Sequence, residues 1–252
     1  MKLWILLPAY NEEKSFDLLI PRISNHLKKE GYDFKIIVCD DGSNDKSAEV
    51  LETLKQSHPL EVLTHKINRG LGETSRDLFE RAAELADPDD IIVRLDCDNT
   101  HEPQYINKLV NKINEGFDVV TASRFQEGGG QTGVTSYRAF ISYSAQIFMK
   151  VVFGFWGQKE FSSGFRAYRA WIIKKAITIY GNQFIQLKGL GFTCTLEKMV
   201  KLKMLGARFA EIGFKLRYDK KTSSSKMVTS ITTLGYLTMA VLYHWPFGGW
   251  KC

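Results

Sequence analysis

The chain has 252 residues, of which 44% are apolar, enough to bury a full hydrophobic core in a single large domain. Aromatic residues make up 12% of the chain and no tract is low in complexity, so a long disordered segment is not expected. The net charge of +6 suits a partner that carries phosphate, but the basic residues are dispersed, which argues against nucleic acid as that partner.

The first half of the chain alternates short apolar runs with segments of helical periodicity. The strand-like runs are 3–7, 34–39, 60–63, 91–95 and 118–122, and the helical segments are 16–30, 47–56 and 74–86. Such alternation is typical of a parallel sheet covered by helices. The expected fold class is therefore α/β, with a Rossmann-like, mostly parallel sheet.

Polar clusters directly follow three of the predicted strands, at 8–13, 40–45 and 96–101. In open α/β sheets the ligand crevice lies beyond the carboxyl ends of the strands, so these clusters are expected to converge on one crevice. Helix capping explains part of the pattern, because Ser43, Asn44 and Asp45 precede the helix expected from Ser47.

The second half of the chain is richer in large apolar residues. Segment 140–156 has the pattern of an amphipathic helix with an aromatic end, which fits a core helix and a membrane-facing helix equally well. Segment 227–250 contains no Asp, Glu, Lys or Arg and is long enough to span a bilayer.

The composition of this last segment favours a helix that lies on the membrane. Its serines and threonines make insertion into the bilayer core less favourable, and Pro246 shortens the usable helix. Tyr243, Trp245 and Trp250 are aromatics typical of the headgroup region. We therefore expect a main α/β domain at 1–227 and an amphipathic, membrane-associated segment at 228–252. A spanning helix and a soluble packing helix are the alternatives.

The four cysteines are far apart in the sequence and form no C-x-x-C pair. This spacing indicates neither a zinc site nor a redox motif and fits a reducing compartment. The apolar run at 3–7 is too short, and lacks the flanking pattern, for a signal peptide. A cytoplasmic location is expected.

The strongest chemical signal is the pair Asp96 and Asp98, which follows the apolar run 91–95. Two carboxylates at a strand end can hold Mg²⁺ or Mn²⁺, and the ion would neutralise charge on a departing diphosphate. An isolated Asp-x-Asp is weak evidence, since chance occurrences in loops are common.

Three other loops strengthen this interpretation. Segment 8–13 supplies a rigid turn, an aromatic ring that can stack on a base, and oxygen acceptors. Segment 40–43 adds a carboxylate that can accept a hydrogen bond from a base, followed by a glycine that permits a tight turn. Segment 68–72 is a second glycine-rich loop and contains Arg69.

In this order and spacing, the motifs resemble the inverting glycosyltransferase family 2, which has the GT-A fold. The similarity is greatest to dolichyl-phosphate and polyprenyl-phosphate mannosyltransferases and extends over nearly the whole chain. Further matching segments are 123–125, 128–129, Arg138, Ser142, 162–169 and 225–227.

The resemblance implies roles for individual residues. The nucleoside would be held by Pro8, Tyr10, Glu12, Cys39 and Asp41, and the metal and diphosphate by Asp96, Cys97 and Asp98. The acceptor phosphate would be bound by Arg124, Arg138 and Ser142, with Arg124 also reaching the donor, and the catalytic set would be Asp98, Arg124 and Arg138. Arg217 and Lys226 match basic residues of a loop that closes over the diphosphate.

The expected reaction brings two phosphate groups together, and fixed cations would screen their repulsion. Any one of these arginines, taken alone, is better explained as a surface ion pair without a functional role. An ionised phosphate acceptor needs no general base, so Glu160 and Glu197 are interpreted as structural, with Glu160 ordering a loop where the family usually has Asp.

Other features also depart from the family pattern. Thr100 stands where Gln or Ser is common, and Gly213 replaces a usual proline. Arg217 and Lys226 are nine residues apart where the family spacing is six, so Lys220 is an alternative to Arg217.

The resemblance thus implies transfer of a hexose, most simply mannose from GDP-mannose, to a polyprenyl or dolichyl phosphate on the cytoplasmic face of a membrane. UDP-glucose as donor, or a polysaccharide or protein as acceptor, is the first alternative. A non-catalytic subunit that binds nucleotide sugar or lipid phosphate is the second. A membrane partner subunit is compatible with each.

Overall fold

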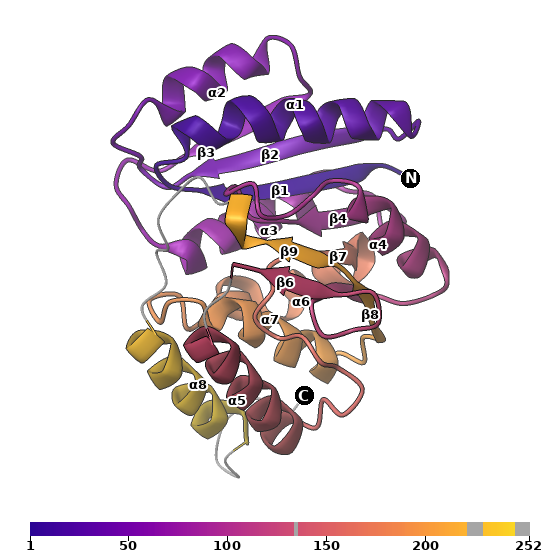
Figure 1. The fold of residues 1–252 in the computed structure, drawn as a ribbon, viewed down its shortest axis with the longest axis vertical. Coiled ribbons are helices and arrows are strands. Elements are labelled where there is room, and N and C mark those ends of the chain that lie inside the picture. Colours follow the sequence, from indigo (N-terminus) through magenta and orange to yellow (C-terminus); the bar gives the residue numbers. More distant parts are fainter. Residues whose placement is uncertain (134–135, 221–228, 245–252) are drawn as a thin grey trace.

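A seven-stranded sheet forms the centre of the described residues, in the order β3-β2-β1-β4-β7-β5-β8, beside a two-stranded β6-β9 sheet (Figure 1). The computed structural model describes residues 1–133, 136–220 and 229–244. The strands are β1 (Leu3–Ala9), β2 (Phe34–Asp40), β3 (Leu60–Thr64), β4 (Ile91–Arg94), β5 (Val119–Ser123), β6 (Gly130–Thr132), β7 (Arg166–Arg169), β8 (Phe209–Gly213) and β9 (Lys215–Arg217).

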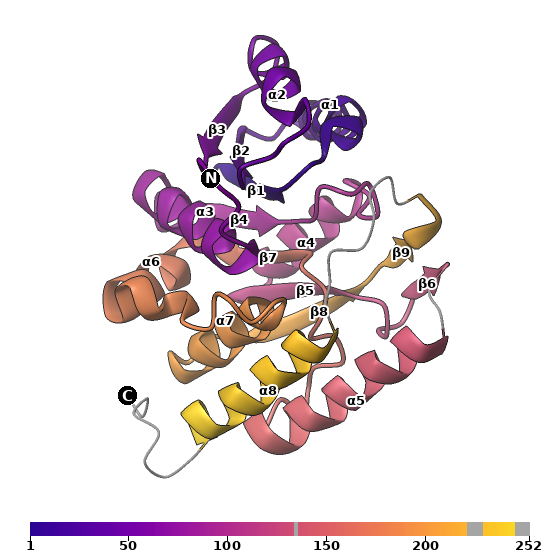
Figure 2. The ribbon, with the colours of Figure 1, turned by 90° about the vertical axis from the view of Figure 1, so that its left-hand side faces the viewer.

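Helices cover both faces of the large sheet, as Figure 2 shows from a second direction. They are α1 (Glu13–Lys29), α2 (Ser47–Lys55), α3 (Leu71–Leu85), α4 (Tyr105–Asn114), α5 (Ser136–Phe153), α6 (Ala170–Tyr180), α7 (Thr193–Met204) and α8 (Thr229–His244). Two 3-10 turns, η1 (Gly181–Ile185) and η2 (Tyr218–Lys220), complete the described elements.

The expected α/β, mostly parallel sheet is confirmed. Strands β1 to β4 are mutually parallel, and β8 is parallel to β5. Strand β7 lies antiparallel between β4 and β5, an insertion that the sequence analysis did not predict.

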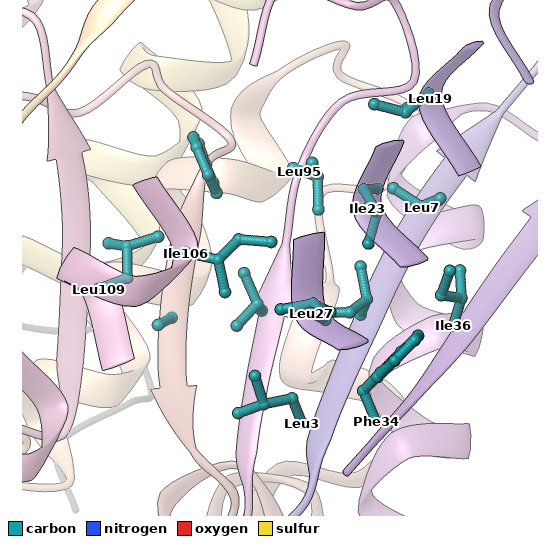
Figure 3. Close-up of a cluster of buried hydrophobic side chains, with 14 of the residues drawn as sticks. Leu3, Leu7, Leu19, Ile23, Leu27, Phe34, Ile36, Leu95, Ile106 and Leu109 are labelled. Atoms are coloured by element: carbon teal, nitrogen blue, oxygen red, sulfur yellow. The ribbon is translucent and has the colours of Figure 1, made fainter. Parts of the chain in front are cut away.

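Helix α1 shows why the first half folds as predicted. Five of its apolar residues recur every three or four positions, which places them on one buried face (Phe16, Leu19, Ile20, Ile23 and Leu27), while Leu18 is exposed on the other side. Figure 3 shows part of this face packed over side chains of β1 and β2.

The opposite face of the sheet carries a second apolar layer. Phe79 of α3 meets Tyr168 of β7 edge-to-face, with ring centroids 5.2 Å apart, and it meets Phe184 of η1 in the same way at 6.1 Å. This layer anchors α3 and α6 beneath the sheet.

Helix α3 begins three residues earlier than predicted, at Leu71, directly after Gly70 with φ of +88°. Gly72 lies inside the helix. A Cβ at this position would overlap the backbone of Lys188, so glycine is required there. A glycine that usually indicates a loop serves here as a close-packing position.

Helices α5 and α8 lie side by side in both views (Figures 1 and 2). Phe148 of α5 stacks on Tyr236 of α8, and Met149 and Met239 are buried with α7. Neither α8 nor any other helix in the described ranges combines the length and apolarity that crossing a bilayer requires. The predicted boundary between 227 and 228 falls at the end of 221–228, outside the described residues.

Candidate functional site

The three polar clusters predicted to converge lie at the carboxyl ends of β1, β2 and β4. Pro8 pairs in register with Cys39, and Leu6 pairs with Arg94 on the other side of β1. The backbone N–H of Leu95 donates to the carbonyl of Leu6 at 3.2 Å, so β4 runs alongside β1 to the start of the Asp96 loop. The loops after these three strands therefore leave the sheet at one edge.

The loops after β1 and β2 are locked together by reciprocal hydrogen bonds. The backbone N–H of Asn11 donates to Ser43 Oγ, and the N–H of Asn44 donates to Asn11 Oδ1, both at 2.8 Å. Asn11 has a φ of +53°, which asparagine tolerates well. The capping interpretation holds in part, because Asp45 Oδ1 accepts from the N–H of Ser47 at the start of α2.

Asp41 is buried, and its carboxylate holds the neighbouring loop. Its Oδ1 accepts from Arg69 N at 2.9 Å and contacts His65 Nδ1 at 2.6 Å, and its Oδ2 accepts from Gly70 N at 2.7 Å. Each carboxylate oxygen can accept two hydrogen bonds, so the predicted contact to a base remains compatible with this arrangement. Tyr10, from the β1 loop, is partly exposed at the same edge.

Cys39 and Cys97 are buried thiols. Burial, together with Asp77, Asp41 and Asp40, raises the pKa of Cys39 to about 12. Burial and Glu12 likewise raise the pKa of Cys97 well above its ordinary value. Neither side chain is a thiolate near neutral pH, so any nucleotide contact at these positions would use the backbone or the neutral thiol.

The two carboxylates of the Asp96 loop differ in their surroundings. Asp98 Oδ1 accepts from Thr100 Oγ1 at 2.6 Å and from Thr100 N at 3.2 Å. Asp96 Oδ1 pairs with Arg94 Nη1 at 2.7 Å, and Asp96 N donates to His101 Nδ1 at 3.1 Å. Thr100 therefore orders the side chain of Asp98, while Arg94 and His101 order Asp96.

This loop has the donor chemistry that Mg²⁺ or Mn²⁺ requires. Both carboxylates are partly exposed at the end of a rigid strand. Within the described residues no three His, Cys, Asp or Glu side chains are gathered to hold a metal. Asp96 and Asp98 would thus supply two oxygen ligands, and donor phosphates and water the rest, which is the usual arrangement for Mg²⁺.

Arg124 is held by Glu160. Its Nε and Nη2 donate to the two carboxylate oxygens at 2.7 and 2.9 Å, and Nη2 also donates to Ser162 Oγ. Burial alone would raise the pKa of Glu160, but Arg124 and hydrogen bonds from Ser162 and Ser163 hold it below its ordinary value. Glu160 therefore orders the 160–163 loop, as expected, and fixes Arg124 beside it.

Of the remaining basic residues, Arg217 lies on β9, Lys220 on η2 and Arg138 on α5. The N–H of Arg217 donates to the carbonyl of Thr100, which brings β9 against the Asp96 loop, while its side chain pairs with Asp219. Lys220 pairs with Glu102 at 3.1 Å. Lys226 and the side chain of Arg138 lie outside the described part of the chain. Ser142, on α5, is partly exposed.

Glu197 is a structural carboxylate. It accepts from the N–H groups of Gln186 and Leu187, pairs with Lys201 at 2.8 Å and accepts from Tyr243 at 2.6 Å. These contacts join α7, the segment after η1 and α8, and Glu197 is fully buried.

Arg94 and His101 were not assigned individual roles from the sequence. The signal for Arg94 was available, because an arginine interrupts an otherwise apolar run in I-I-V-R-L. His101 carried no such signal, because its role depends on its place against the backbone of Asp96.

The family described as Glycosyl transferase family 2 matches residues 4–177, which is more than half of the chain and includes the loops after β1, β2 and β4. The chain belongs to this family. Dolichol-phosphate mannosyltransferase of Pyrococcus furiosus is 29% identical over 204 residues, which cover 81% of this chain and 53% of that protein. Undecaprenyl-phosphate 4-deoxy-4-formamido-L-arabinose transferase of Pectobacterium atrosepticum is 34% identical over 122 residues, 48% of this chain and 36% of that protein. The chain thus spans about half or less of these relatives.

The fold is also that of solved glycosyltransferases. Glucosyl-3-phosphoglycerate synthase from Mycobacterium tuberculosis, in complex with Mn²⁺, UDP and glucosyl-3-phosphoglycerate, superposes with a TM-score of 0.62 at 17% identity, covering 95% of this chain and 79% of that one. Mannosyl-3-phosphoglycerate synthase from Rubrobacter xylanophilus gives 0.57 at 18% identity, covering 96% and 73%. At these identities the likeness shows the GT-A-like fold.

Proposed function

We propose that this family 2 protein transfers a hexose from a nucleotide diphosphate sugar to a polyprenyl phosphate, with Mg²⁺ or Mn²⁺ bound at Asp96 and Asp98. The observation that carries the proposal is the convergence of the β1, β2 and β4 loops, which places these carboxylates at the same sheet edge as Tyr10 and Asp41. The relatives named for dolichol phosphate and undecaprenyl phosphate support the lipid acceptor.

The chain's own groups fit the demands of this reaction. A bound metal would neutralise the charge that develops on the leaving diphosphate. Tyr10 and Asp41 would hold the nucleoside, and Arg124, Arg138 and Ser142 would bind the acceptor phosphate. An acceptor that is already ionised attacks without a general base, which agrees with the structural roles of Glu160 and Glu197.

Arg217, Lys220 and Lys226 are proposed to screen the diphosphate. The backbone contact between Arg217 and Thr100 supports this role, because it sets β9 beside the Asp96 loop. GDP-mannose is the favoured donor, in line with the mannosyltransferase relative, and UDP-glucose is the alternative.

An exposed apolar surface on α5 and α8 supports the proposal of a lipid acceptor. The outward faces of α5 and α8 expose Phe140, Tyr143, Ile147 and Val151, and Ile231, Leu234, Leu237 and Val241, respectively. Because α8 also buries Met239 inward, it is apolar on both sides, which a helix facing only water would not favour. We propose that α5, α8 and the rest of 228–252 lie on the cytoplasmic face of a bilayer, with 1–227 as the catalytic part.

A transfer assay tests the proposal. Purified protein with Mn²⁺ or Mg²⁺, GDP-mannose or UDP-glucose, and a polyprenyl phosphate in liposomes is expected to form a lipid-linked sugar. Asp98→Ala should lower the rate by at least about a hundredfold, since it removes one of the two ligands of the metal that would stabilise the charge on the leaving diphosphate. Its thermal unfolding should match the wild type.

Three outcomes would contradict it. Folded wild-type protein that is inactive towards the whole donor and lipid panel would refute it, as would full activity in Asp98→Ala. Transfer to a water-soluble saccharide in place of the lipid would replace the acceptor with the first alternative.

A further inference from the structure

Arg94 is a buried cation in direct contact with the predicted metal site. It ends β4, after three apolar residues, and its Nη1 lies 2.7 Å from Asp96 Oδ1. Its Nε is buried and has no hydrogen-bond partner among the described residues. Gly164 covers the side chain so closely that a Cβ at this position would overlap the guanidinium.

The environment of Arg94 is positively charged. Arg94 pairs in register with Arg166, which is fully buried and donates to the neutral oxygens of Thr121, Phe161 and Thr195. Burial, together with the charges of Arg94 and Arg166, lowers the pKa of the nearby Lys198. Among the described residues, Asp96 is the carboxylate that pairs with Arg94, so it serves as counter-ion to this buried charge.

His101 restrains Asp96 from the other side. Because His101 Nδ1 accepts the N–H of Asp96, the neutral ring carries its proton on Nε2, which lies 3.7 Å from Asp96 Oδ2. The ring is buried and stacks on Phe165 with centroids 5.0 Å apart. Asp96 therefore faces a guanidinium on one oxygen and an imidazole N–H on the other.

We infer that Arg94 makes divalent metal binding at Asp96 and Asp98 depend on the diphosphate of the donor. This rests on the proposed function. Two carboxylates and one guanidinium leave a single net negative charge for the cation, so metal alone binds weakly. A nucleoside diphosphate adds the missing negative charge, and by thermodynamic reciprocity the metal strengthens diphosphate binding by the same factor.

Arg94 could affect metal binding in two opposite ways, by orienting the Asp96 carboxylate or by repelling the cation. If Arg94 mainly oriented the carboxylate, removing it would weaken metal binding. If its charge opposes the metal, removing it strengthens metal binding in the absence of nucleotide. The sign of the change separates the two roles.

The test measures Mn²⁺ affinity of the full chain by electron paramagnetic resonance, without nucleotide and with saturating GDP or UDP. The variants are Arg94→Met, Arg94→Gln and, as matched control, Arg169→Met. Arg169 lies on the same pair of strands, opposite Ile91 at the far end of β4, and donates to the carbonyl of Ile113. Arg94→Gln keeps a side-chain donor for Asp96 without the charge.

Both Arg94 variants are expected to bind Mn²⁺ alone about tenfold more tightly than the wild type, within the usual range of coupling between sites. With saturating nucleotide, the Arg94 variants should bind Mn²⁺ as tightly as the wild type, so the gain in Mn²⁺ affinity produced by nucleotide should shrink by the same factor. Arg169→Met should match the wild type in both conditions. If Arg94→Met does not fold, Arg94→Gln decides.

Unchanged or weaker Mn²⁺ binding in the folded Arg94 variants overturns the inference and leaves the proposed function intact. Weaker binding in Arg94→Met that Arg94→Gln restores also overturns it, in favour of an orienting hydrogen bond. Wild-type protein that binds no Mn²⁺ even with nucleotide overturns both.

Discussion

Arg124 shows how a residue can match a family position and still depend on its neighbours. Its guanidinium is nearly enclosed, and the shortest of its hydrogen bonds go to Glu160 and Ser162. Nη1 donates to Gln131 over 3.3 Å, the longest of the set. In the proposed function, this edge of the guanidinium would exchange Gln131 for the acceptor phosphate, while Glu160 keeps the other edge fixed.

Lys198 is a buried cation whose effect on stability can be measured. Burial, with smaller contributions from Arg94 and Arg166, lowers its pKa to about 7, and its Nζ lies 4.5 Å from the centroid of the Phe79 ring. The unfolded chain retains this proton up to about pH 10.4, so between about pH 7 and pH 10 unfolding takes up a proton and the free energy of unfolding rises with pH.

Lys198→Met is therefore expected to be more stable than the wild type at pH 7. The difference should narrow towards pH 10 by up to about 1.4 kcal/mol per pH unit. Urea unfolding at pH 7, 8 and 9 measures this difference in stability. Lys175→Met is the control, because Lys175 is exposed. A stability difference that stays constant over this range would show that Lys198 does not change its charge.

At the scale of elements, α5 and α8 present an apolar face that predicts lipid binding. Leu234 and Leu237 on α8 are 57% and 56% exposed. Replacing both with aspartate removes two apolar anchors, each worth roughly 1.5 to 3 kcal/mol when fully buried, and adds charge. Sedimentation with anionic liposomes is expected to weaken at least about tenfold.

Leu18→Asp is the matched control, because Leu18 is 56% exposed on α1, away from α5 and α8. It should leave liposome binding unchanged, and the thermal midpoints of both variants should stay close to that of the wild type. Equal binding by the α8 variant and the wild type would contradict a membrane role for this face.

The elements also show what sequence reasoning can reach. Strands β1 to β4 and helices α1 to α3 were predicted because apolar runs alternate locally with helical periodicity. Strand β7 was missed because its four residues, R-A-Y-R, suggest a surface segment, although Arg166 is fully buried. Its burial depends on oxygens of Thr121, Phe161 and Thr195 that only the tertiary structure brings near.

In the candidate site, too, some features could be predicted from the sequence and others could not. The position of Asp96 and Asp98 beside the β1 and β2 loops was predictable, because the ends of parallel strands meet at one edge. The partners of the basic residues were not, since Arg124 meets Glu160 across 36 positions and Lys220 meets Glu102 across 118. No local pattern records such contacts.

At the scale of the whole molecule, the sheet order places the loops of β1, β2 and β4 together and brings the β6-β9 pair beside them (Figure 1). The N–H of Arg217 on β9 contacts the carbonyl of Thr100 directly. The same chain carries α5 and α8 at another side of the fold, so the surface proposed to bind lipid and the edge proposed to bind nucleotide belong to one body.

The most direct test of this account is a crystal structure with Mn²⁺ and GDP or UDP, in which the metal is located by its anomalous scattering. The account predicts a manganese peak between Asp96 and Asp98, bridged to the diphosphate, with the base near Tyr10 and Asp41. A manganese ion bound elsewhere, or a nucleotide seated away from these carboxylates, would contradict it.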